Sequence, residues 1–223
     1  MLRLLAVATA ALASGSALAA QDAPTPSAPA ARSPAHTHIR HVAESFRGTP
    51  DRRGLLPTAV AEAEIAVRHA ALAGSEPADL AAMQRHAGHV LHALDPSAIE
   101  GGPGLGYGVI RAAERTAHWA GLAVASDGGG DAIRTHGPHV AGAARGAAVR
   151  AGEAAEVARE VMEADSAEEA AALVERLVEL VTQMTDGLDA DADGRISWQE
   201  AEGGLAQARQ HLDFLLSGEG LTG

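Results

Sequence analysis

The chain has 223 residues and a formal net charge of −12, with 29 acidic residues against 17 basic ones, all of them arginine. A chain this acidic lacks the basic face that nucleic-acid binding requires. The absence of cysteine and lysine excludes disulfides, thiolate metal sites and Schiff-base chemistry.

Residues 1–19 have the features of a secretory signal peptide. Arg3 supplies a positive start, Leu4–Leu12 is apolar, and Ala17-Leu18-Ala19 is a small-residue cleavage site. No other stretch is long and apolar enough to span a membrane. We therefore expect a periplasmic or secreted bacterial protein without a membrane anchor.

Residues 20–56 are predicted to form a disordered linker followed by a polar segment. Gln21–Pro34 is rich in proline, alanine and serine, a composition that does not bury a core. The polar segment has no clear period and holds at most one short helix, near His41–Phe46. Three histidines give it a cluster suited to metal capture: His36, His38 and His41.

Residues 57–164 are predicted to be a helical bundle, because apolar residues recur there at three- and four-residue spacing. Four helices are expected, with the glycine-rich stretch 101–108 as a hairpin connector between the second and the third. The second helix carries an apolar stripe: Leu80, Met83, Ala87, Val90 and Leu94. We expect an all-α, four-helix bundle of two duplicated hairpins, in which the second and fourth helices run parallel.

A histidine pattern is repeated in the two hairpins. His69 is followed by a His-x-x-His-Val sequence at 86–90, and His118 is followed by another at 136–140. Histidines at i and i+3 lie on one helix face, and imidazole suits copper, nickel and zinc. The six candidate ligands are His69, His86, His89, His118, His136 and His139. The alternative is that these histidines lie on a solvated face, and His211 is expected to serve packing or the surface.

Residues 64–94 and 106–144 resemble the small metal-binding protein family, which are histidine-rich periplasmic four-helix bundles. The resemblance lies in the pattern of these segments, and this chain has fewer histidines per helix. It implies binding of divalent transition metals, Cu2+ especially and also Ni2+ or Zn2+, for buffering or sequestration.

Residues 165–216 are predicted to form a helix-loop-helix, with a tail at 217–223. Ser166 and Glu169 form a capping box that opens the first helix, and the second is expected from about Trp198. Between them, Asp189–Glu200 fits the pattern D-x-[DN]-x-[DN]-G-x5-E at every position. Alternate carboxylates supply the hard oxygen ligands that calcium needs, and a glycine at the sixth position permits the sharp turn.

This loop resembles the EF-hand family. The resemblance implies Ca2+ ligation by Asp189, Asp191, Asp193, Arg195 (through its carbonyl), Ser197 and Glu200. EF-hands usually occur in pairs, and no second loop is visible in the sequence. Ile196, which in the family pairs with a second loop, makes a homodimer through this single EF-hand a candidate arrangement.

The sequence thus leads to one main hypothesis and one alternative. The main hypothesis is a non-enzymatic, periplasmic or secreted calcium-binding EF-hand protein. The alternative is a Cu, Ni or Zn buffer or chaperone that uses the duplicated His-x-x-His hairpins. No enzyme is expected, because the H-E-x-x-H and G-x-S-x-G patterns are absent.

Overall fold

The computed structural model describes residues 33–221, so the predicted signal peptide (1–19) lies outside the described residues. The described part is built from helices and contains no β-strand, which confirms the all-α prediction. The elements are α1 (Pro34–Ala43), the short 3-10 helix η1 (Pro50–Arg52), α2 (Leu55–Ser75), α3 (Leu80–Leu94), α4 (Val109–Ala125), α5 (Asp131–Glu163), α6 (Ala167–Asp186) and α7 (Leu205–Gly218).

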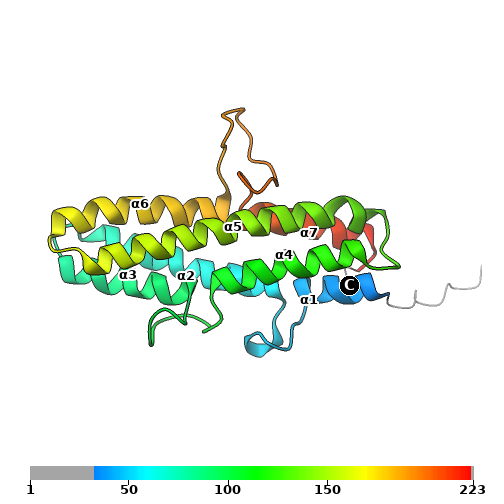
Figure 1. Cartoon of the computed structure of the whole chain (residues 1–223), viewed down its shortest axis with the longest axis horizontal. Coiled ribbons are helices and arrows are strands. Elements are labelled where there is room, and N and C mark those ends of the chain that lie inside the picture. The colour runs from blue at the N-terminus through cyan, green and yellow to red at the C-terminus, as the bar shows by residue number, and fades with distance from the viewer. Residues whose placement is uncertain (1–32, 222–223) are drawn as a thin grey trace, which may run out of the picture. The chain divides into compact units, whose positions relative to one another are not determined.

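The helices are arranged in four antiparallel rows (Figure 1). The first row contains α1 followed by α2, the second α3 followed by α4, and the fourth α6 followed by α7. The third row is the single long helix α5, which packs against α3, α4, α6 and α7. α2 closes the arrangement by packing against α3, α4 and α6. A loop therefore interrupts every row except the third.

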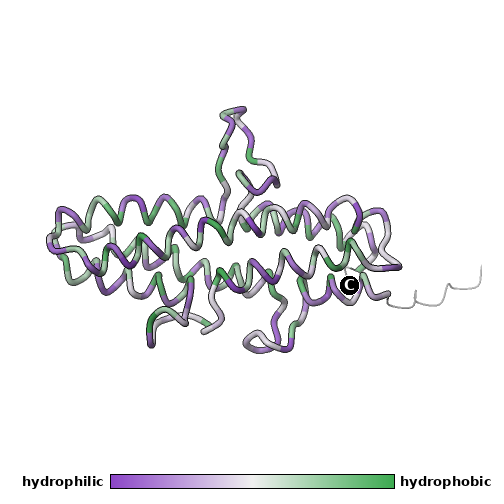
Figure 2. The backbone as a smooth tube through the Cα atoms, in the orientation of Figure 1, coloured by the Kyte–Doolittle hydropathy of each residue, from purple (hydrophilic) through white to green (hydrophobic). Residues whose placement is uncertain are grey.

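Alanine dominates the packed faces of these helices. On α5, the buried alanines include Ala143, Ala147, Ala151, Ala154 and Ala158. Their spacing of three and four residues keeps them on one face, where small side chains let neighbouring helices approach closely. Figure 2 shows the corresponding alternation of hydrophobic and hydrophilic residues along the helices.

The glycine-rich connector does not form the predicted hairpin. It carries the chain onward from α3 to α4 in the same direction (Figure 1). The reason is Glu62, a fully buried carboxylate on α2 that accepts hydrogen bonds from the backbone N–H groups of Leu105, Tyr107 and Gly108 at 2.8–2.9 Å. As a consequence α3 and α5 run antiparallel, whereas the sequence pattern predicted parallel helices.

The described part of the segment predicted as a linker contains α1, which is part of the core. Ser33 caps this helix by accepting a hydrogen bond from the N–H of His36. Ala35, Ile39 and Val42 are fully buried, and α1 packs against α4 and α2. The expected short helix near His41–Phe46 is thus found slightly earlier in the chain, because the apolar residues that bury it lie between 35 and 42.

Within residues 33–221, no helix combines the length and the apolar character that crossing a membrane requires.

Candidate metal centres

The first histidine cluster consists of His69 on α2 and His86 and His89 on α3. The Nδ1 atom of His69 lies 3.1 Å from Nδ1 of His86 and 3.3 Å from Nδ1 of His89. All three side chains are half-buried, and their ligand atoms lie within 4.8 Å of one another. Two nitrogens bound tetrahedrally to one zinc ion at about 2.0–2.1 Å are about 3.3–3.4 Å apart. The observed spacing is therefore close to that of ligands sharing one ion.

Hydrogen bonds account for this arrangement only with one nitrogen shared between two contacts. A neutral imidazole carries one proton, on one of its two nitrogens, and the other nitrogen presents a lone pair. The nitrogen of His69 contacts two others, and a single proton on it satisfies only one of these contacts. A metal ion would accept all three lone pairs at once.

The second histidine cluster consists of His136 and His139 on α5 and His211 on α7. The Nδ1 atoms of His136 and His211 are 3.1 Å apart, and the three ligand atoms again lie within 4.8 Å of one another. Nδ1 of His139 is buried and has no hydrogen-bond partner. A buried polar atom without a partner is costly, and an ion held by this cluster would supply one.

The two clusters share one ring geometry. The pairs His69–His86 and His136–His211 are both stacked with ring centroids 5.3 Å apart. Equally, the pairs His69–His89 and His139–His211 are both edge-on at 4.6 Å. His211 therefore takes in the second cluster the position that His69 takes in the first.

The structure places five of the six predicted histidine ligands in the two clusters, and His211 takes the place of the sixth. His118 is exposed on α4 and belongs to neither cluster, so its predicted pairing with His136 and His139 is not found. His211, expected to serve packing or the surface, takes that place. No local spacing signals this, because His136 and His211 are 75 residues apart. The two His-x-x-His pairs belong to separate clusters.

Burial and mutual repulsion favour the neutral form of His69, His89, His139 and His211. Burial lowers the pKa of His211 to about 4, assisted by His139 and His136. Burial also lowers the pKa values of His69, His89 and His139, and neighbouring cluster histidines lower them further. Neutral imidazole is the form that binds a metal, so these shifts favour the metal-binding form of those four histidines.

Aromatic side chains cover the second cluster. Trp198 stacks on His139 with ring centroids 3.8 Å apart and an angle of 16°, and Phe214 lies 5.5 Å from the ring of His136. Trp198 belongs to the segment between α6 and α7, residues 187–204, which we call the acidic loop.

The acidic loop reaches the second cluster because one face of α5 accepts its backbone. A Cβ atom added at Gly142 or Gly146 would collide with carbonyl oxygens of the loop. One turn further along the same face, the buried guanidinium of Arg150 donates hydrogen bonds to the carbonyl oxygens of Ala201 and Gly203. These contacts fix Trp198 against His139.

The acidic loop also gathers carboxylates, in a set that differs from the predicted one. Ligand atoms of Asp189, Asp191 and Glu202 lie within 4.8 Å of one another. Asp189 accepts hydrogen bonds from the N–H groups of Asp193 and Gly194, and Gly194 has a φ of 84°, as the sharp turn at that position requires.

The remaining predicted calcium ligands are not part of this group of carboxylates. They contact α5 or other residues of the acidic loop. The carboxylate of Glu200 pairs with Arg145 of α5 at 3.0 Å, and that of Asp193 accepts a hydrogen bond from the N–H of Arg195. The N–H of Ser197 donates to Glu202 at 2.9 Å, and hydrogen bonds from Ser197 lower the pKa of Glu202. α7 begins at Leu205, not near Trp198 as predicted, because the segment before it is bound to α5.

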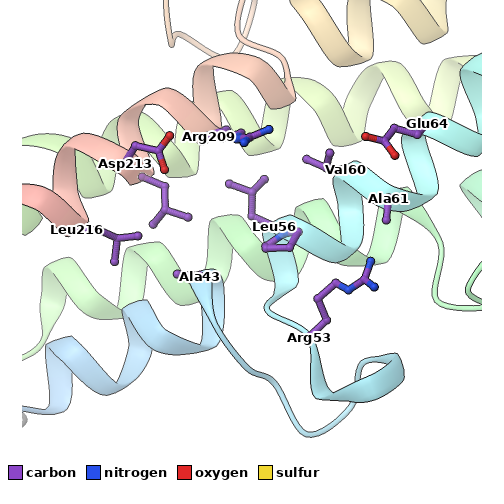
Figure 3. A pocket seen from close by; sticks show the side chains of 11 residues that line it. Ala43, Arg53, Leu56, Val60, Ala61, Glu64, Arg209, Asp213 and Leu216 are labelled. Atoms are coloured by element: carbon purple, nitrogen blue, oxygen red, sulfur yellow. The ribbon is translucent and has the colours of Figure 1, made fainter. Parts of the chain in front are cut away.

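A cavity of about 390 Å³ lies between α1, α2 and α7 (Figure 3). Leucine and alanine side chains line it, and side chains of both charges lie around it: Arg53, Glu64, Arg209 and Asp213. No histidine lines this cavity, so it is separate from both clusters.

Comparison of the chain with models of known protein families, with curated proteins and with solved structures finds no match.

Proposed function

We propose that this protein binds divalent transition metals, one ion in each of its two histidine clusters, as a non-enzymatic buffer or carrier. The observation that carries the proposal is the grouping of three histidines in two places with one ring geometry, with Nδ1 atoms at 3.1 and 3.3 Å in the first cluster and one Nδ1 pair at 3.1 Å in the second. Three neutral imidazoles suit copper, nickel and zinc. The signal peptide expected at residues 1–19 would place this activity in the periplasm or outside the cell.

Three protein ligands leave a further position open on the bound ion. In a storage or carrier protein such a position lets a partner or a small chelator remove the ion. An open position is also what a catalytic centre requires, but neither cluster has a carboxylate among its grouped ligands to act as a general base. We therefore propose reversible metal binding.

The test is a calorimetric titration of the chelator-stripped protein with copper, nickel and zinc. Replacing His86 and His89 by alanine should remove the first site and leave the second, and replacing His136 and His139 should do the reverse. His92→Ala is the matched control, because His92 lies on α3 near the first cluster but contacts the carbonyl oxygen of Ile99. If the variant lacking all four histidines binds as much metal as the wild type, the proposal is wrong.

Calcium binding by the acidic loop is a second candidate function, supported by the grouping of Asp189 and Asp191 with Glu202. An EF-hand would use Glu200, which here pairs with Arg145. Calcium should raise the melting temperature of the wild type, and Asp189→Asn should abolish that rise. Comparing Glu200→Gln with Glu202→Gln then identifies the carboxylate that completes the site. An equal rise in wild type and Asp189→Asn would rule out calcium binding at this loop.

A further inference from the structure

Nine of the eleven histidines fall into three groups of the same composition. Each group joins a His-x-x-His-Val sequence on one helix to a single histidine on a neighbouring helix. Two of these are the clusters described above. In the third group, His38 and His41 on α1 precede Val42, and His118 lies on α4, against which α1 packs.

The third group surrounds an indole. Trp119 of α4 has ring-centroid distances of 5.1 Å to His38, 4.6 Å to His41 and 5.8 Å to His118. The His41–Trp119 pair is edge-on at 73°, the same distance and angle as His139–His211 in the second cluster. His41 is the second histidine of its motif. Relative to it, the ring of Trp119 takes the position that the single histidine on the neighbouring helix takes in the other two clusters.

In this group one ring nitrogen of His38 has no hydrogen-bond partner, and one of His41 can keep its lone pair. Nδ1 of His38 is buried and has no partner, like Nδ1 of His139 in the second cluster. Nδ1 of His41 lies 3.2 Å from the carbonyl oxygen of Ser45, to which it can only donate, so the neutral ring keeps its lone pair on Nε2. Burial lowers the pKa of His38, and the neighbouring His41 and His118 lower it further.

The two histidines outside the three groups each have another partner. His36 contacts the carboxylate of Glu219 at 3.0 Å, and His92 contacts the carbonyl oxygen of Ile99 at 3.3 Å. The orphaned nitrogen of His38 is therefore not a general feature of the histidines in this fold.

We propose that the junction of α1 and α4 is a third site for a divalent transition metal, held by His38 and His41 and completed by the exposed His118. The proposal rests on the function proposed for the first two clusters. The third site binds more weakly, because Trp119 separates its imidazoles and the rings must rotate to meet at one ion.

Trp119 makes this site observable. The chain has two tryptophans, so in Trp198→Phe the only indole is the one among His38, His41 and His118. Copper(II) added to this otherwise full-length variant should first fill the two clusters. The third, weaker equivalent should then quench the fluorescence of Trp119, giving about three ions per chain at saturation.

Replacing His38 and His41 by alanine should remove the last equivalent and its quenching, and leave the first two. His118→Ala, a surface change, provides a second variant should the double variant unfold, and it should weaken the last equivalent. The control is His36→Ala with His92→Ala, which should keep all three. Saturation at two ions, or quenching that persists unchanged without His38 and His41, overturns the third site alone. Failure of the first two equivalents to bind would instead overturn the proposed function.

Discussion

The first and second histidine clusters have nearly the same ring geometry but are built in different ways. The first joins residues 17 and 20 positions apart, across the turn between α2 and α3. The second joins His136 to His211 across 75 positions and depends on the docking of α7 against α5. The same arrangement of imidazole rings can therefore arise from a local hairpin or from tertiary packing, and only the hairpin leaves a visible pattern in the sequence.

The surroundings of the two clusters also differ. The exposed Arg68 and Arg85 lie beside the first cluster and contribute to the lowered pKa values of His69 and His89. The second cluster has Trp198 and Phe214 against its rings instead. A dication bound in the first cluster as proposed would be repelled by nearby positive charge, whereas one in the second would lie beside aromatic rings.

The largest expected effect distinguishes His118, which the sequence predicted for the second cluster, from His211, which the structure places there. His211→Ala should weaken metal binding at the second cluster by at least about 100-fold, because losing even an outer partner of a ligand costs roughly 10–100-fold. His118→Ala should leave both clusters unchanged. Calorimetry with zinc measures both variants, and a loss at the second cluster in His118→Ala rather than His211→Ala would mean that the α5–α7 geometry is wrong.

A smaller effect concerns the dependence of the unfolding free energy on pH. The pKa of His211 is about 4 in the folded protein, against roughly 6.5 for an unperturbed histidine. Between these values the unfolded chain binds a proton that the folded chain does not. The stability contributed by this neutral histidine is therefore complete above pH 6.5 and is lost as the pH falls towards 4. In the metal-free protein, His211→Phe should make the unfolding free energy fall less steeply over that range, as urea titrations at successive pH values would show. An unchanged slope would contradict the lowered pKa.

The smallest effect tests the charges beside the first cluster. Removing Arg68 or Arg85 should strengthen binding of a dication there by up to about fivefold, because an exposed charge interaction is worth roughly 0.2–1 kcal/mol. The gain should shrink at high salt, and the second cluster should not respond. Weaker binding in Arg68→Ala would show that this arginine supports the first cluster.

The sequence predicted the local features of this fold well. Ser166 caps α6 as expected, accepting a hydrogen bond from the N–H of Glu169, and the predicted stripe on α3 is buried from Met83 to Leu94. Such features depend on residues within one or two helical turns of each other, so spacing alone reveals them.

The wrong predictions concern features of the fold that depend on contacts between residues far apart in the sequence. Glu62 holds the connector 43 or more positions away and so reverses the expected direction of α4. Arg150 holds the segment before α7 in a non-helical conformation through carbonyl groups more than 50 positions away. Neither residue has a partner that could be identified from spacing, and His211 was missed for the same reason.

The second cluster joins residues that are far apart in a chain without cysteine, which has no disulfide to hold them together. Bringing together residues 75 apart in an unfolded chain costs about 1.3 kcal/mol more than bringing together residues 17 apart, from the logarithmic dependence of loop entropy on length. The unfolded chain therefore competes less well for the second ion than for the first. An ion bound at the second cluster as proposed would act as a reversible cross-link between the last helix and the rest of the bundle. The attachment of that helix would then depend on how much metal the surroundings supply.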